Sequence, residues 1–94
     1  MPYITPQRKE AFAEFRHAID TLRIDSAGEM NYLITTLALT YLGQHGETYK
    51  TLNEVVGAME CAKCEFYRRR VVVLEDAKRA ENGDVFAPPI RGHE

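Results

Sequence analysis

Apolar residues along this chain recur every three or four positions, the spacing that places side chains on one side of an α-helix. Two such stripes come first: Phe12, Phe15, Ile19 and Leu22, then Met30, Leu33, Ile34, Leu37, Ala38 and Tyr41. No stretch alternates apolar and polar residues over the length of a typical strand. The pattern therefore predicts an all-α fold.

The ends of the first two helices are marked by residues that satisfy unpaired backbone groups. Thr5 followed by Pro6 predicts a helix start, because proline at the first helical position sacrifices no hydrogen bond. Ser26 and Glu29 match a capping box, which opens the second helix. Gly43 is the predicted left-handed cap that ends it, since glycine adopts that conformation at little cost. The first helix is expected to span residues 7–23 without interruption.

The third helix is predicted to be the longest. Thr51 and Glu54 form a second capping box, with Thr48 as an alternative start one turn earlier, and Gly83 ends the pattern. Roughly 30 residues at 1.5 Å each give a helix of about 45 Å. The valine triplet at 71–73 favours a strand by propensity, but the helical periodicity on both sides outweighs it.

These elements predict one domain, 1–94, built as a helical hairpin packed on the long third helix. Residues 1–5 form an N-terminal arm and residues 84–94 an extended C-terminal tail. We expect Val85 and Phe86 to pack back on the helices and Ile90 to Glu94 to be loose.

Two cations interrupt the apolar face of the third helix. In a regular α-helix Lys63 and Arg70 lie two turns apart on that face, flanked by Tyr67 and Glu60. Arginine presents a planar fork for phosphate or carboxylate, and tyrosine offers a stacking face. Lys63, Tyr67, Arg70 and Glu60 are thus a candidate site for a small anionic, nucleotide-like ligand. The alternative is that both cations pair with acidic residues of neighbouring helices.

Composition and size favour self-association. The chain has 94 residues, 45% of them apolar, and a domain this small buries a modest fraction of its surface alone. Val71 and Val72 also carry apolar character around the third helix, beyond its main stripe. We therefore expect a homo-oligomer. The first residues lack a signal peptide's apolar run and no apolar stretch is long enough for a membrane span, so we expect a cytoplasmic protein without membrane contact.

Most of the chain from Asn31 to Phe86 resembles a family of small uncharacterised proteins of bacteria and their phages. The resemblance rests on the Met-Pro-Tyr-Ile start, on Glu-Cys-Ala-Lys-x-Glu-Phe-Tyr-Arg-Arg at 60–69 and on Glu-Asn-Gly-Asp-Val at 81–85. It implies a family without an assigned activity. It also implies an apolar residue in relatives where this chain has Cys64, and one arginine fewer before the valines.

Three other groups of residues suggest chemistry. Cys61 and Cys64 have redox-motif spacing, but they lie in mid-helix, away from the dipole that activates a thiol. Glu54, Glu65 and Asp76 recur every eleven residues and so share one helix face. All-α nucleotide hydrolases hold magnesium on carboxylates clustered within one or two turns of facing helices, so a solvated face is the simpler interpretation here. Three successive arginines at 68–70 suggest a nucleic-acid contact, against which the net charge of −2 argues.

The sequence thus favours a small non-enzymatic accessory protein that binds a protein partner or a small anionic ligand. No segment carries a catalytic, cofactor or metal-site signature. A divalent-metal nucleotide hydrolase is the alternative, and a weak nucleic-acid-binding module is the second.

Overall fold

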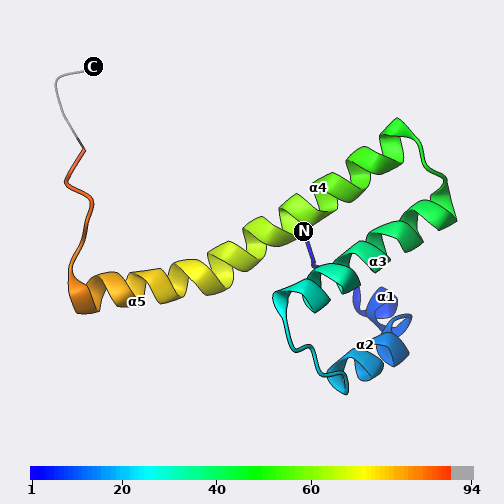
Figure 1. Cartoon of the computed structure of the whole chain (residues 1–94), viewed down its shortest axis with the longest axis horizontal. Helices are drawn as coiled ribbons and strands as arrows, with labels where there is room; N and C mark the ends of the chain where they lie inside the picture. The colour runs from blue at the N-terminus through cyan, green and yellow to red at the C-terminus, as the bar shows by residue number, and fades with distance from the viewer. Residues whose placement is uncertain (90–94) are drawn as a thin grey trace. The chain divides into compact units, whose positions relative to one another are not determined.

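The computed structural model describes residues 1–89, and within them it contains helices and no strand. The elements are α1 (Pro6–Glu10), α2 (Ala13–Asp20), α3 (Ala27–His45), α4 (Tyr49–Phe66), a π-helical turn (Tyr67–Val71) and α5 (Val72–Asn82) (Figure 1). The all-α prediction, with a long C-terminal helical stretch, is confirmed. The expectation for Ile90 to Glu94 lies outside the described residues. The chain divides into two compact units, Met1–Ala62 and the part from Lys63 onward.

The first helix is broken, which corrects the expectation of one continuous helix. Thr5 caps α1, its hydroxyl accepting a hydrogen bond from the Arg8 amide at 3.3 Å. The Phe12 amide then donates to Lys9 O at 3.0 Å, three residues earlier. Such a bond tightens the chain into a 3₁₀-like turn, so the α-helical pattern must restart. The Arg8 guanidinium lies over the Phe12 ring at 5.3 Å and adds a cation–π contact across this turn.

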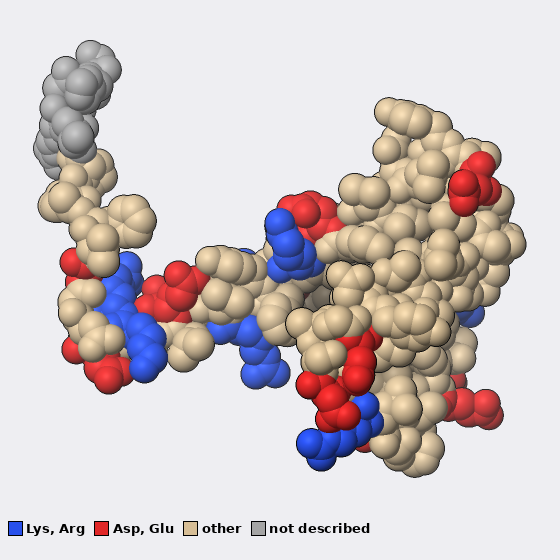
Figure 2. Space-filling view, in the orientation of Figure 1, with Lys and Arg blue, Asp and Glu red and all other residues tan. Residues whose placement is uncertain are grey.

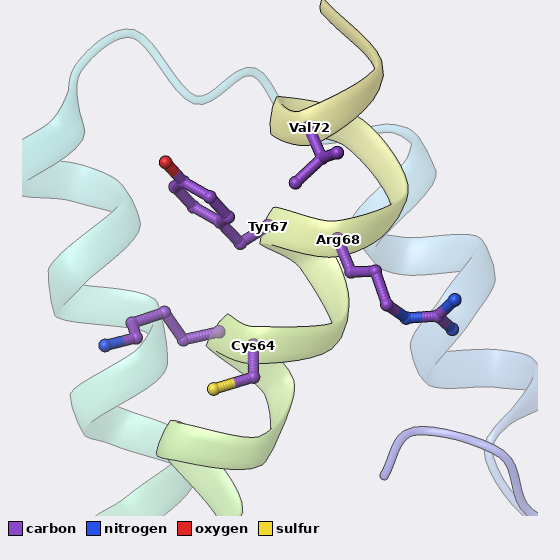
Figure 3. A pocket seen from close by; sticks show the side chains of 5 residues that line it. Cys64, Tyr67, Arg68 and Val72 are labelled. Carbon is purple, nitrogen blue, oxygen red and sulfur yellow. The ribbon is translucent and has the colours of Figure 1, made fainter. Parts of the chain in front are cut away.

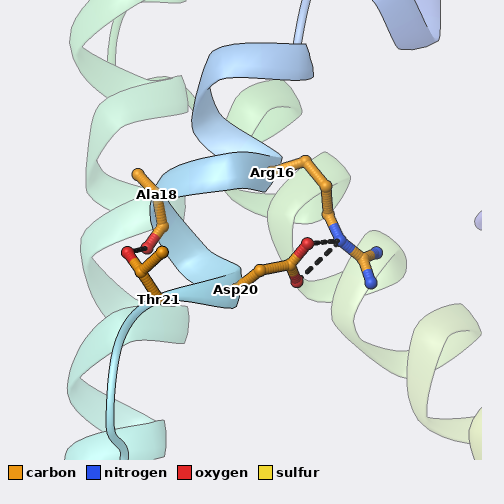
Figure 4. Close-up of polar contacts among 4 residues, drawn as sticks. All are labelled: Arg16, Ala18, Asp20 and Thr21. Carbon is orange, nitrogen blue, oxygen red and sulfur yellow. Dashed lines mark hydrogen bonds and ion pairs between the residues drawn. The ribbon is translucent and has the colours of Figure 1, made fainter.

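Helix α2 ends at Asp20 rather than at Arg23. The Thr21 hydroxyl donates to Ala18 O at 2.8 Å, and the Thr21 amide donates to the same oxygen (Figure 4). The Thr21 side chain therefore occupies the Ala18 carbonyl, which would accept a backbone amide if the helix continued for another turn. One turn earlier, Arg16 and Asp20 form an ion pair at 3.0 Å, which is exposed and contributes little to stability.

Helix α3 begins as the capping box predicts and ends later than expected. The Ser26 hydroxyl accepts from the Glu29 amide at 3.1 Å, and the Glu29 carboxylate accepts from the Asp25 amide at 2.9 Å. The helix passes through Gly43 and ends with Gly46 as its cap, whose φ of 89° lies in the region that favours glycine. The prediction of Gly43 as the cap was wrong, because Gly46 also offers that conformation one turn later.

The only two buried side chains among the described residues flank the turn between α3 and α4: Leu42 near the end of α3 and Thr51 near the start of α4. The Thr51 hydroxyl donates to Gly46 O at 2.6 Å and accepts from the Thr48 amide at 2.8 Å. The Thr48 hydroxyl in turn accepts from the Thr51 amide at 3.2 Å. Thr48 thus caps α4, which confirms the earlier of the two predicted starts. Farther along, Tyr41 of α3 donates its hydroxyl to Glu54 of α4 at 3.2 Å.

A π-helical turn separates α4 from α5, and this corrects the expectation of a regular third helix. The Val72 amide donates to Tyr67 O, five residues earlier instead of four. A π turn holds one more residue than an α turn does, so every side chain after it is rotated relative to the regular pattern by one position. The predicted stacking of Lys63 and Arg70 assumes the regular α-helical step, which this turn interrupts.

The segment after α5 also differs from expectation. Gly83 ends the helix with a φ of 89°, as predicted. Val85 and Phe86, however, are 94% and 85% exposed instead of packing on the helices. The Asp84 carboxylate accepts the Phe86 amide at 2.9 Å, a local turn that holds this backbone without burying its side chains.

Candidate functional site

The second unit carries a shallow groove of about 360 Å³ along its helix, lined by Lys63, Cys64, Tyr67, Arg68 and Val72. Figure 3 shows the side chains of Tyr67 and Arg68 leaving the helix in different directions, with Cys64 one turn away. Two of the four residues that the sequence nominated, Lys63 and Tyr67, line this groove. Arg70 and Glu60 are not among its lining residues.

Two polar groups that line the groove, those of Arg68 and Tyr67, contact carboxylates. The Arg68 guanidinium contacts the Glu65 carboxylate at 2.6 Å, three residues away. The Tyr67 hydroxyl donates to the Glu75 carboxylate at 2.8 Å. The Glu65 and Glu75 carboxylates thus lie beside a groove that the cations Lys63 and Arg68 line.

The contact between Tyr67 and Glu75 depends on the π turn. On a regular α-helix, two side chains eight positions apart point about 80° away from each other. The π turn between them holds one extra residue, which brings the two side chains close to the same side of the helix. Sequence reasoning missed this pair, since a regular α-helix directs residues eight positions apart too far from each other for this hydrogen bond.

Glu75 raises the pKa of the Tyr67 phenol above its ordinary value of 10.0, first through the hydrogen bond and then through its negative charge. Both effects favour the protonated phenol, the form that can donate. Because the pKa is raised on folding, the stabilisation is fully present below pH 10.0 and is lost as the pH rises through the raised pKa.

We expect Glu75→Gln to return the pKa of Tyr67 toward its ordinary value, since the amide keeps an acceptor and removes the charge. NMR titration of the tyrosine ring carbons measures this. Tyr41 serves as the internal control, because its pKa is raised by desolvation and by Glu54, which the substitution leaves in place. An unchanged Tyr67 titration would show that Glu75 does not bind this phenol in solution.

The three carboxylates proposed as metal ligands are engaged separately. Glu54 accepts from Tyr41 at 3.2 Å, Glu65 contacts Arg68, and Asp76 contacts Arg79 at 3.4 Å. Within residues 1–89, no group of three or more His, Cys, Asp or Glu side chains is placed to hold a metal ion. Cys61 and Cys64 are exposed thiols in mid-helix and form no disulfide.

The larger feature is exposed apolar surface. Leu42 is the one apolar residue that is buried in the part of the chain that the structure describes, at 9% exposure. Many large apolar side chains in and beside the helices are at least two-fifths exposed, among them Phe12, Phe15, Leu22, Met30, Ile34, Leu37, Leu39, Leu52, Val56, Met59, Phe66, Val73 and Leu74. In Figure 2 uncharged residues cover most of the first unit, while charges of both signs crowd the end of α5. Monomeric proteins rarely expose so much apolar surface, which marks sites of interaction.

No helix in the described residues is both long enough and apolar enough to cross a membrane. No curated protein and no solved structure is similar enough to this chain to be matched. Residues 1–85 match the model of a family described as a domain of unknown function, DUF6899. Since the match covers nearly the whole chain and starts at its first residue, the protein belongs to this uncharacterised family.

Proposed function

We propose that the protein is a non-enzymatic helical interaction protein, whose exposed helix faces bind another protein chain and so complete its core. The observation that carries this proposal is the burial of a single apolar side chain, Leu42, among the described residues. Folding costs about 1–2 kcal/mol per residue in backbone entropy, and burial of apolar surface is the main term that offsets it. The surface left bare here is therefore the surface that a partner covers.

A protein partner fits this surface better than a small anion does. The groove beside Lys63 is shallow, and its Arg68 and Tyr67 are held by carboxylates at 2.6 and 2.8 Å. Pockets for small ligands are usually deep enough to bury most of the ligand. A hydrolase is less well supported, because Glu54, Glu65 and Asp76 are each engaged by a neighbouring side chain. Two exposed thiols fit a reducing compartment such as the cytoplasm.

We expect the dilute chain to bind a dye specific for exposed apolar surface and to unfold over a broad temperature range, because its core is incomplete without a partner. Dye fluorescence and circular dichroism at submicromolar concentration measure both properties. Nucleotides and inorganic phosphate, each with and without Mg²⁺, are expected to leave the unfolding temperature unchanged. A sharp transition without dye binding would contradict the proposal, and so would stabilisation by any nucleotide.

A further inference from the structure

The helix of the second unit carries its charges in a reciprocal order. Three arginines, Arg68 to Arg70, precede four apolar residues, Val71 to Leu74, and two acids, Glu75 and Asp76, follow them. We call residues 66–79, which contain this arrangement, the pairing segment. Reversing its direction exchanges the basic end with the acidic end and leaves the apolar centre in place.

The apolar side chains of the pairing segment are open to a partner. Phe66 is 65% exposed, Val73 63% and Leu74 60%. Each is a large apolar side chain whose burial against a partner would stabilise the pair. Ala77, one turn after Val73, is small enough to let a second helix approach closely.

We infer that the pairing segment binds the same segment of a second copy in antiparallel orientation. This inference rests on the proposed function and names the partner for this one surface. A two-fold axis between Val72 and Val73 places the apolar centres of the two copies against each other. The same axis places the arginine end of each copy beside the Glu75–Asp76 end of the other.

Electrostatics selects the antiparallel arrangement. A parallel pair would set arginines beside arginines and acids beside acids, and like charges opposed across an interface cost several kcal/mol. In the antiparallel pair, the basic end of each copy lies beside the acidic end of the other. The favourable contact is made twice, because a two-fold interface repeats every contact. This self-complementarity favours a second copy over an unrelated protein, whose surface would need to match the same order by chance.

Two charges of the pairing segment, those of Arg70 and Asp76, can pair across the interface at little cost. Arg70 is exposed, and no ion pair joins it to another residue of the described chain. Asp76 contacts Arg79 at 3.4 Å with both side chains 59% exposed, and such an exposed pair is worth little. Exchanging that contact for one with an arginine of the partner therefore costs little.

The test exchanges charge blocks. One variant carries Arg69→Glu and Arg70→Glu, and another carries Glu75→Lys and Asp76→Lys. When either variant pairs with itself in the antiparallel arrangement, like charges face each other at both ends. We therefore expect the dissociation constant of the dimer to rise roughly a hundredfold. Mixing the two variants restores opposite charges at both ends, so native mass spectrometry should detect a mixed dimer in excess of either self-pair. A variant with all four substitutions should dimerise by itself, and it is the control if either parent folds poorly.

Variants that dimerise as the original chain does, or a mixture that forms no mixed dimer, would overturn the antiparallel pairing. If the variants still formed oligomers whatever their charges, the chain would be using another protein-binding surface. The broader interaction proposal would then stand. Chains that remain folded monomers without dye binding would instead overturn the proposed function itself.

Discussion

Leu42→Ala is expected to lower the free energy of unfolding by about 2–3 kcal/mol, which is a large part of the stability of a small domain. Leu42 is 9% exposed and lies at the end of α3, where the turn into α4 is closed by Thr51 and Gly46. Truncation removes buried methyl groups and leaves a cavity that the hydrogen-bonded turn cannot collapse to fill. Denaturant unfolding monitored by circular dichroism measures the effect.

Leu39→Ala is the matched control. Leu39 lies on the same helix three residues earlier and is 60% exposed. The same truncation there removes little buried surface, so the expected loss is below about 1 kcal/mol. Equal losses at Leu39 and Leu42 would mean that the turn between α3 and α4 is not where this chain concentrates its packing.

The second large effect is expected from Leu74→Glu, which should raise the dissociation constant of the dimer by about a hundredfold or more. Leu74 is 60% exposed in the single chain, and glutamate and leucine have similar helix propensities, so the isolated helix should tolerate the change. In the antiparallel pair the new carboxylate would lie in the apolar centre, where an unpaired charge costs several kcal/mol. Sedimentation velocity at several concentrations measures the dissociation.

Leu39→Glu provides the control, because Leu39 has the same exposure of 60% but lies in the first unit, outside the pairing segment. We expect this variant to retain the dimer. Dissociation by Leu39→Glu, with an unaffected Leu74→Glu dimer, would place the interface on α3 and would contradict the antiparallel pairing.

Helix starts were predictable from the sequence because they depend on a few neighbouring side chains. Thr5 and Ser26 cap the helices that the spacing predicts, since each hydroxyl accepts an amide three residues later. The end of α3 was less certain, because Gly43 and Gly46 both allow a left-handed cap. Local chemistry restricts the end of the helix to one of these two glycines. The rings of Tyr41 and His45, whose centroids are 4.4 Å apart, pack together and so stabilise the additional turn.

The interruptions within helices were not predictable in the same way. The 3₁₀-like turn before Phe12 and the π turn from Tyr67 to Val71 both change the hydrogen-bonding step without any proline or glycine at the point of change. Helical periodicity assumes a constant step, so each interruption rotates every later position out of the predicted face. The prediction that Lys63 and Arg70 share one face assumed this constant step through residues 67–71, where the π turn lies.

The extent of exposed surface also lay beyond sequence reasoning. A stripe such as Met30, Ile34 and Leu37 predicts that a helix face is buried, but it does not say against what. In the structure Ile34 and Leu37 are 44% and 52% exposed, which shifts the question from core packing to partners. The same pattern of residues is compatible with a core inside one chain or with an interface between chains.

The molar mass of the unmodified chain, measured by light scattering over a wide range of concentrations, tests most directly whether a second copy completes this protein. We predict a mass of twice 10.7 kDa at high concentration and a fall toward 10.7 kDa on dilution, accompanied by a loss of cooperative unfolding. A constant mass of 10.7 kDa, with an unfolding transition that stays sharp and independent of concentration, would contradict it.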